Sequence, residues 1–238
     1  MFSFNADRYD FWPLYETIKK YYPIGLSKEN SRLFFNSYAG IKEYHKLIQD
    51  NLVNKKTYQS KWKSFDDKIE HKINIRPVVT NGLSPSYSSK VEIENVKFGD
   101  LTRVKRIHYF ISFLGPYYTI IGDDLSIVPI VEETLFRTNY LIVSPFNEFE
   151  ELFKTIAEEI ECCFKAYQFV PFFILKGTLN GLELPHAEGH VNTIFSALFN
   201  SEFDLNHPVR GDEYFRDKVW TNADWDNSSG FVAYPGKI

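Results

Sequence analysis

The spacing of apolar residues changes twice along the chain and divides it into three regions. In residues 9–72, and again after Pro145, apolar positions recur about every third or fourth residue, which predicts helices. Between them, residues 74–143 hold long β-rich runs. We therefore expect an α+β fold with a central antiparallel sheet, helices packed on it and a helical N-terminal part. No internal repeat or low-complexity linker interrupts residues 1–238, which favours a single domain.

The first part, residues 1–72, contains two helical patterns. Ser27 is a possible N-cap for a helix with Gly40 as a bend or break, and its apolar positions are Leu33, Phe34, Ile41, Tyr44, Ile48 and Leu52. Over residues 56–71, four apolar side chains recur at helical spacing, namely Tyr58, Trp62, Phe65 and Ile69. The second pattern predicts an amphipathic helix with an aromatic face packed against the rest of the protein.

The middle part, residues 74–143, is expected to be antiparallel strands. Gly115-Pro116 separates β-rich runs at 104–114 and 117–121, and since proline cannot donate to a central ladder, it must lie in a turn or on an edge. Both alternating sets of side chains in 107–114 are apolar or aromatic, so this strand should be covered on both faces. Further strands are expected at 127–131 and 140–143, with Pro129 marking an edge or a bulge.

The last part, residues 147–238, is expected to hold a helix, a strand, a short helix and a loop-rich acidic tail. Asn147 and Glu150 resemble a capping box, and the apolar stripe from Phe149 to Tyr167 has helical spacing. Residues 169–175 are typical of a strand, and 191–198 of a short helix.

Charge is distributed unevenly between the two halves of the sequence. Residues 1–106 contain 19 Lys and Arg against 12 Asp and Glu, a balance of +7, whereas residues 107–238 contain 8 against 19, a balance of −11. The total is only −4. One-signed charge of this kind is either solvated or meets a partner of opposite sign.

Composition and targeting signals favour a cytoplasmic protein without membrane contact. With 44% apolar and 17% aromatic residues the chain can bury a sizeable core. No stretch has the roughly 18 apolar residues of a membrane span, and the first residues lack the pattern of a secretory signal. Cys162 and Cys163 are adjacent, too close for an ordinary disulfide, and we expect both to be reduced.

The sequence contains only weak candidates for a metal-binding or catalytic site. His186, Glu188 and His190 could bind a metal ion, but the order of residues differs from the zinc-hydrolase patterns, and helix-end or surface contacts explain them as well. The carboxylate pairs Asp123-Asp124 and Glu132-Glu133 resemble the acids of Mg²⁺-dependent nucleases without their companion lysine motif. Phosphate-binding loops and a G-x-S-x-G elbow are absent, and no cofactor is expected.

Nucleic-acid binding is not favoured either. Six lysines accompany the aromatic residues of 55–72, which alone would suit phosphates and stacked bases. The aromatic residues share one face, however, and Asp66, Asp67 and Glu70 dilute the charge. A solvated helix surface accounts for this pattern.

The C-terminal stretch is the strongest candidate for a partner-binding surface. Acids and aromatic residues alternate there among loop residues, a mixture that suits an interface with a basic protein. The alternative is that the tryptophans attach the tail to the body while the acids keep it soluble. The candidate binding residues are Asp204, Asp212, Glu213, Tyr214, Asp217, Trp220, Asp224, Trp225 and Asp226.

The aromatic segments add a resemblance to a known class of proteins. The helical N-terminal part ending in Tyr21-Tyr22-Pro23-Ile24-Gly25, the hairpin from His108 to Gly122 and the acidic face resemble immunity proteins of bacterial polymorphic-toxin systems. The resemblance implies a non-catalytic inhibitor that binds a cognate toxin domain, here a basic one, and occludes its active site. Two alternatives remain open: a metal-dependent hydrolase using His186, Glu188 and His190, and a structural or oligomeric subunit whose oppositely charged halves neutralise each other between copies.

Overall fold

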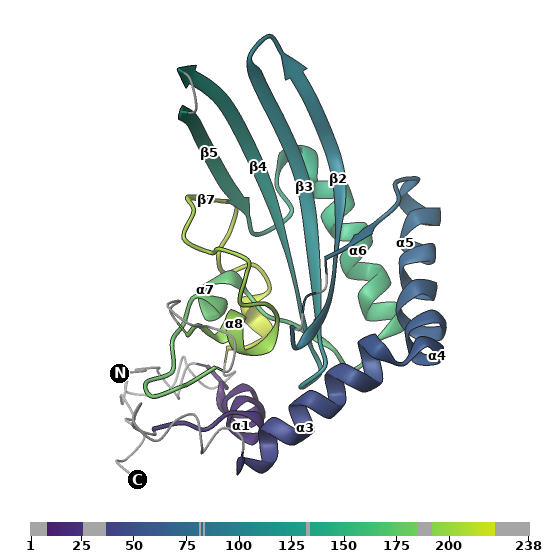
Figure 1. The fold of residues 1–238 in the computed structure, drawn as a ribbon, viewed down its shortest axis with the longest axis vertical. Helices are drawn as coiled ribbons and strands as arrows, with labels where there is room; N and C mark the ends of the chain where they lie inside the picture. Colours follow the sequence, from purple (N-terminus) through teal and green to yellow (C-terminus); the bar gives the residue numbers. More distant parts are fainter. Residues whose placement is uncertain are drawn as a thin grey trace.

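Four long antiparallel strands form the centre of the protein (Figure 1). The computed structural model describes residues 9–25, 37–80, 82, 84–131, 134–184 and 192–221, and of residues 130, 131, 134 and 135 only the backbone. Helices pack on both faces of the sheet and the N-terminal part is helical, which confirms the α+β prediction. The long strands are β2 (Ser86–Phe98), β3 (Leu101–Ser112), β4 (Tyr117–Val131) and β5 (Thr134–Ile142).

The predicted hairpin around Gly115-Pro116 is confirmed. β3 ends at Ser112 and β4 begins at Tyr117, whose main-chain N–H donates to the carbonyl of Gly115 at 2.8 Å. Residues 107–112 of β3 are all buried, so this part of the strand is covered on both faces as its composition predicts. The pairing of β4 with β5 is irregular between Pro129 and Val131, in agreement with the predicted bulge.

Three short strands extend the sheet at its margins. β1 (Val78–Val79) pairs antiparallel with β2, whereas β6 (Gln168–Phe169) pairs parallel with β4 and β7 (Val209–Arg210) parallel with β5. The long strands are therefore antiparallel as expected, and the complete sheet is mixed.

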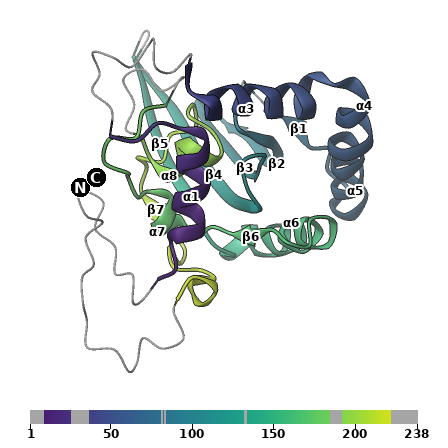
Figure 2. The same cartoon turned by 90° about the horizontal axis from the view of Figure 1, so that it is seen from below.

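One face of the sheet is covered by two neighbouring helical segments, seen side by side in Figure 2. The first runs through α4 (Lys55–Thr57), η3 (Tyr58–Lys63) and α5 (Ser64–Ile73), and the second is α6 (Glu150–Cys163). Trp62, Phe65 and Ile69 are at most 2% exposed, so the predicted amphipathic helix does bury its aromatic face. None of the helices in the described ranges has the length and apolar character needed to span a membrane.

The opposite face is covered by helices from both ends of the chain. They are α1 (Trp12–Tyr21), α3 (Ala39–Ile48), which continues as η2 (Gln49–Val53), α7 (Phe172–Leu175) and α8 (Ile194–Leu198). Phe110 of β3 projects into this core and contacts the ring of Phe195 edge to face, with ring centroids 5.1 Å apart. Segments far apart in sequence thus share one core.

Gly40 lies next to a break in helical structure, in agreement with the prediction, because the backbone of Tyr38 is extended (φ −67°, ψ 124°) and α3 begins only at Ala39. It is the second residue of α3, and a Cβ atom there would lie 2.1 Å from the carbonyl oxygen of Lys20 and 2.8 Å from Cα of Tyr21. Glycine is needed because α1 and α3 approach each other closely at this point. Ser27 and the apolar positions Leu33 and Phe34 lie outside the described residues.

The predicted capping box at Asn147 and Glu150 is wrong. Asn147 has a left-handed φ of 47° and begins the short helix η4 (Asn147–Phe149), and no side chain caps α6. α6 also ends at Cys163, so Tyr167 lies beyond it. Residues 169–175 are not one strand: β6 ends at Phe169 and α7 follows Pro171, whose fixed φ suits a helix start.

The far halves of the long strands extend beyond the covering helices (Figure 1). Burial falls along β3 from Ile107, which is fully buried, to the half-buried residues 101–104. At the same end, Phe98 of β2 is 65% exposed and Phe136 of β5 is 54% exposed. The sheet thus has one half enclosed by helices and one half that is open to solvent on both sides.

Candidate functional site

The acidic C-terminal stretch is held firmly against the body as far as Thr221, where the described residues end. β7 extends the sheet beside β5, and the main-chain N–H of Asp212 then donates to Oγ of Ser144 at 2.8 Å. The carboxylate of Glu213 pairs with Nζ of Lys176 at 2.5 Å, and its carbonyl accepts from the N–H of Phe173. This part of the predicted binding stretch therefore has a defined conformation.

Tyr214 is the exposed aromatic residue of this stretch. Its side chain is 55% exposed, and its ring stacks on the ring of Phe173 with centroids 4.7 Å apart. The main-chain N–H of Tyr214 donates to Oδ1 of Asp212 at 2.9 Å, a turn that fixes the backbone beneath the ring. Because stacking already restricts the rotamers of Tyr214, its side chain loses little conformational entropy when a partner covers it.

Trp220, by contrast, lies in the core. It is 3% exposed, its indole N–H donates to the carbonyl of Phe169 at 2.8 Å, and its ring contacts that of Tyr117. Its own carbonyl accepts from the N–H of Asp10. Trp220 thus attaches the C-terminal stretch to the body and does not contribute to its surface.

The same stretch continues the outer surface of α6. Phe215 contacts Phe153 of α6 edge to face, with centroids 5.8 Å apart, and the guanidinium of Arg216 forms an ion pair with Glu161 and donates to the hydroxyl of Tyr118. We call this surface the acidic face; its acids are Glu150, Glu151, Glu158, Glu161, Asp212 and Asp217. Of the bases on the same segments, Lys154 and Arg216 are paired with Glu150 and Glu161, and Lys165 and Lys218 are exposed, so the six acids still outnumber the bases.

The remaining predicted binding residues do not all join the acidic face. Asp204 lies on the loop before β7, where it accepts from the amide of Asn206 and lies 3.6 Å from the ring of His207. Asp224, Trp225 and Asp226 lie outside the described residues. The structure therefore brings together Asp212, Glu213, Tyr214 and Asp217.

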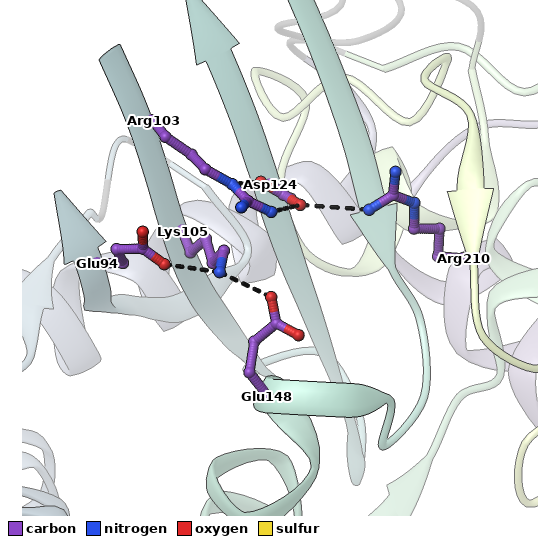
Figure 3. Close-up of polar contacts among 6 residues, drawn as sticks. All are labelled: Glu94, Arg103, Lys105, Asp124, Glu148 and Arg210. Atoms are coloured by element: carbon purple, nitrogen blue, oxygen red, sulfur yellow. Dashed lines mark hydrogen bonds and ion pairs between the residues drawn. The ribbon is translucent and has the colours of Figure 1, made fainter. Parts of the chain in front are cut away.

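A second charged cluster lies where the enclosed half of the sheet meets the open half, since Lys105 and Asp124 are buried and Arg103 is half-buried (Figure 3). Arg103 and Arg210 both contact Oδ2 of Asp124, at 2.9 and 3.3 Å, and Arg210 also stacks over the ring of Tyr140. Lys105 bridges two carboxylates beside them, those of Glu94 at 2.6 Å and Glu148 at 2.7 Å. Acids and bases balance in this cluster.

The two adjacent aspartates of β4 point to opposite faces of the sheet. Asp124 belongs to the cluster of Figure 3, whereas Asp123 contacts Arg106 at 2.5 Å and His108 at 3.1 Å on the other face. Burial opposes ionisation of Asp123, but the bonds from His108 and Arg106 outweigh it, and the pKa of this carboxyl is lowered. Because their carboxylates diverge, the pair cannot hold one Mg²⁺ ion between them. Glu132 and Glu133 lie outside the described residues.

These contacts also account for much of the charge asymmetry in the sequence. Lys72, Arg103, Lys105 and Arg106 belong to the basic half, and each is paired with an acid from the other half, respectively Glu159, Asp124, Glu148 and Asp123. The two halves therefore neutralise each other partly within one chain. The oligomeric alternative would therefore have to rest on the charges that remain in each half.

Comparisons with protein-family models, curated proteins and solved structures found no match to this chain.

The residues proposed for a metal site, His186, Glu188 and His190, lie outside the described part of the chain. Within that part, no three His, Cys, Asp or Glu side chains gather closely enough to hold a metal ion. Cys162 is exposed, and the half-buried Cys163 donates to Glu159 at 3.2 Å. Burial and this carboxylate raise the pKa of the Cys163 thiol, which disfavours a reactive thiolate.

The buried carboxyl of Asp66 is a site that the sequence did not reveal. It lies between α5 and the sheet, where its oxygens accept from the hydroxyls of Tyr109 at 2.5 Å, Tyr87 at 2.6 Å and Ser89 at 3.1 Å. Desolvation by burial raises its pKa against the effect of these bonds. In the sequence Asp66 is one of several acids among lysines, and the only hint was its position next to the buried Phe65.

Proposed function

We propose that the chain is a non-catalytic binding protein that neutralises a cognate, basic toxin domain by occluding its active site. The observation that carries this proposal is Tyr214, which is exposed, stacked on Phe173 and bordered by the acidic face. Aromatic anchors surrounded by polar rims carry most of the binding energy in protein interfaces. The resemblance to immunity proteins supplies the class of partner.

The charge of the acidic face supports a basic partner. Glu150, Glu151, Glu158 and Asp212 are exposed, and two of the nearby bases, Lys154 and Arg216, are engaged in ion pairs. Negative charge at the rim speeds the encounter with a basic surface and rejects acidic ones, while the buried anchor determines the lifetime of the complex. Covering a basic cleft in this way requires no reaction by this chain.

The proposal is tested with the product of the gene adjacent to this one. We expect that product to arrest growth when expressed alone and to be harmless when this chain is co-expressed. In titration calorimetry of the two purified proteins, affinity should fall as salt is raised, because rim charges are screened. A neighbouring product that forms no complex with this chain would contradict the proposal.

Two variants locate the interface. Tyr214→Ala should weaken binding by about 2 kcal/mol, roughly 30-fold, as for a central anchor. Phe98→Ala removes a similarly exposed aromatic side chain at the open end of the sheet and should leave affinity unchanged. Equal affinities for wild type and Tyr214→Ala would refute the assignment of this surface.

A further inference from the structure

The outer edge of β5 is unpaired over most of its length within the described part of the chain. β7 pairs only with Leu141 and Ile142, where the N–H of Leu141 donates outward to the carbonyl of Pro208 at 2.9 Å. Since main-chain groups alternate in direction along a strand, the N–H and C=O groups of Arg137 and Asn139 point to the same side as those of Leu141. These groups form an open hydrogen-bonding edge beside the uncovered half of the sheet.

The opposite edge of the sheet, formed by β2, is protected against pairing with another strand, whereas the edge of β5 is not. β1 covers Ser89 and Lys90 of β2, and beyond them the register shifts between Glu92 and Glu94. Bulges and charged residues are the devices by which proteins prevent a strand edge from pairing with other chains. From Phe136 to Tyr140, β5 pairs regularly with β4 and carries one charge, that of Arg137.

The side chains along the β5 edge have different chemistry on the two faces of the sheet. Phe136 shares one face with its partner Val128 and is 54% exposed. Arg137 lies on the opposite face in a row of paired residues with Ile127, Thr102 and Lys97, which contains no acid. Arg137 is exposed and forms no ion pair within the described part of the chain.

We propose that the edge from Phe136 to Asn139 binds an extended segment of a partner protein as an additional strand. The segment is apolar on the side of Phe136 and acidic on the side of Arg137. Main-chain bonds to Arg137 and Asn139 supply affinity, and alternating side chains supply specificity, as in other cases of strand addition. This surface is separate from Tyr214 and does not depend on the proposed toxin partner.

The test uses the whole protein and two synthetic capped decapeptides, one alternating valine with aspartate and one alternating valine with lysine. Amide exchange of Arg137 and Asn139, followed by NMR, should be slowed by the aspartate peptide and much less by the lysine peptide. We expect affinities that differ by about fivefold or more, from opposite against like charges across a strand pair. No protection at roughly millimolar peptide, or equal protection by both, would overturn the proposal.

Variants separate the main-chain and side-chain parts of the proposal. Arg137→Glu should reverse the preference between the peptides, whereas Lys97→Glu, the same charge change in the same row at the other edge, should not. Arg137→Pro removes an outward N–H without removing a bond to β4, and should abolish binding of both peptides. Reversal by Lys97→Glu, or an unchanged preference in Arg137→Glu, would show that the peptides bind elsewhere.

Discussion

The buried carboxyl of Asp66 gives a prediction whose size follows from its surroundings. Replacing it with alanine removes the acceptor of three hydroxyl groups, those of Tyr87, Ser89 and Tyr109, all of which are 0% exposed. A buried donor left without a partner costs about 1–3 kcal/mol, and groups that share one acceptor are not additive. We therefore expect Asp66→Ala to lower the free energy of unfolding by about 3–5 kcal/mol.

Asparagine distinguishes the loss of hydrogen bonds from the cost of burying charge. Its Oδ1 still accepts and its Nδ2 can donate to a hydroxyl that reverses its role, so Asp66→Asn should cost about 1 kcal/mol at neutral pH. Because the pKa of Asp66 is raised from 3.8, protonation favours the folded wild type as pH falls through the raised pKa towards 3.8. The difference in stability between wild type and Asp66→Asn should consequently grow on acidification.

The assay is urea unfolding followed by circular dichroism at a series of pH values. Asp67→Asn serves as the control, because this neighbouring carboxylate is 58% exposed and pairs only loosely with Lys63, at 3.6 Å. A difference between wild type and Asp66→Asn that shrinks as pH is lowered would refute the reasoning. It would mean that the three hydroxyls stabilise the charged carboxylate by more than its burial costs.

Three further predictions concern packing and charge. Trp220→Ala should lower the free energy of unfolding by about 3–5 kcal/mol, measured by thermal or urea unfolding, and Trp220→Phe should lower it by less. A loss below about 1 kcal/mol for the alanine variant would show that the side chain is not part of the core. Gly40→Ala should lower the free energy of unfolding, measured by calorimetry, by about 1–3 kcal/mol or more, because the added Cβ meets the backbone of α1. An unchanged free energy of unfolding would mean that the two helices separate easily. Asp123→Asn should lower the free energy of unfolding by about 3 kcal/mol at neutral pH, because Arg106 and His108 lose their charged partner. This loss should vanish as pH falls below 3.8 and through the lowered pKa of Asp123, where the wild-type carboxyl is itself protonated. A loss of stability that persists in acid would contradict the ion-pair account.

The elements that could be predicted from the sequence are those whose pattern is local. Tyr58, Trp62, Phe65 and Ile69 mark one helix face at fixed spacing, and the proline at 116 separates two β-rich runs at hairpin distance. The capping box failed because φ at Asn147 is left-handed, which a sequence match of two residues cannot reveal. The expected strand at 169–175 failed because Pro171 starts a helix within an apolar run that suits either structure.

The candidate site was only partly predictable, for a different reason. Tyr214 and Trp220 have the same chemistry and similar neighbours in sequence, yet one stacks on the surface and the other is buried against Phe169 and Tyr117. That choice depends on residues 41 to 103 positions away, which no local pattern contains. Asp66 is similar, since its acceptor role is set by Tyr87 and Tyr109 on two strands.

The division of the long sheet into an enclosed and an open half has a consequence for how the protein can change during evolution. Tyr109 and Phe110 lie in the two different cores, so substitutions in this part of β3 disturb one core or the other, and most would reduce the amount of folded protein. Residues at the open end, such as Phe98, Phe136 and Arg137, contribute little to either core and can vary at small cost in stability. Related chains could therefore diverge in the partners they recognise at this end while the helix-covered half keeps the fold unchanged.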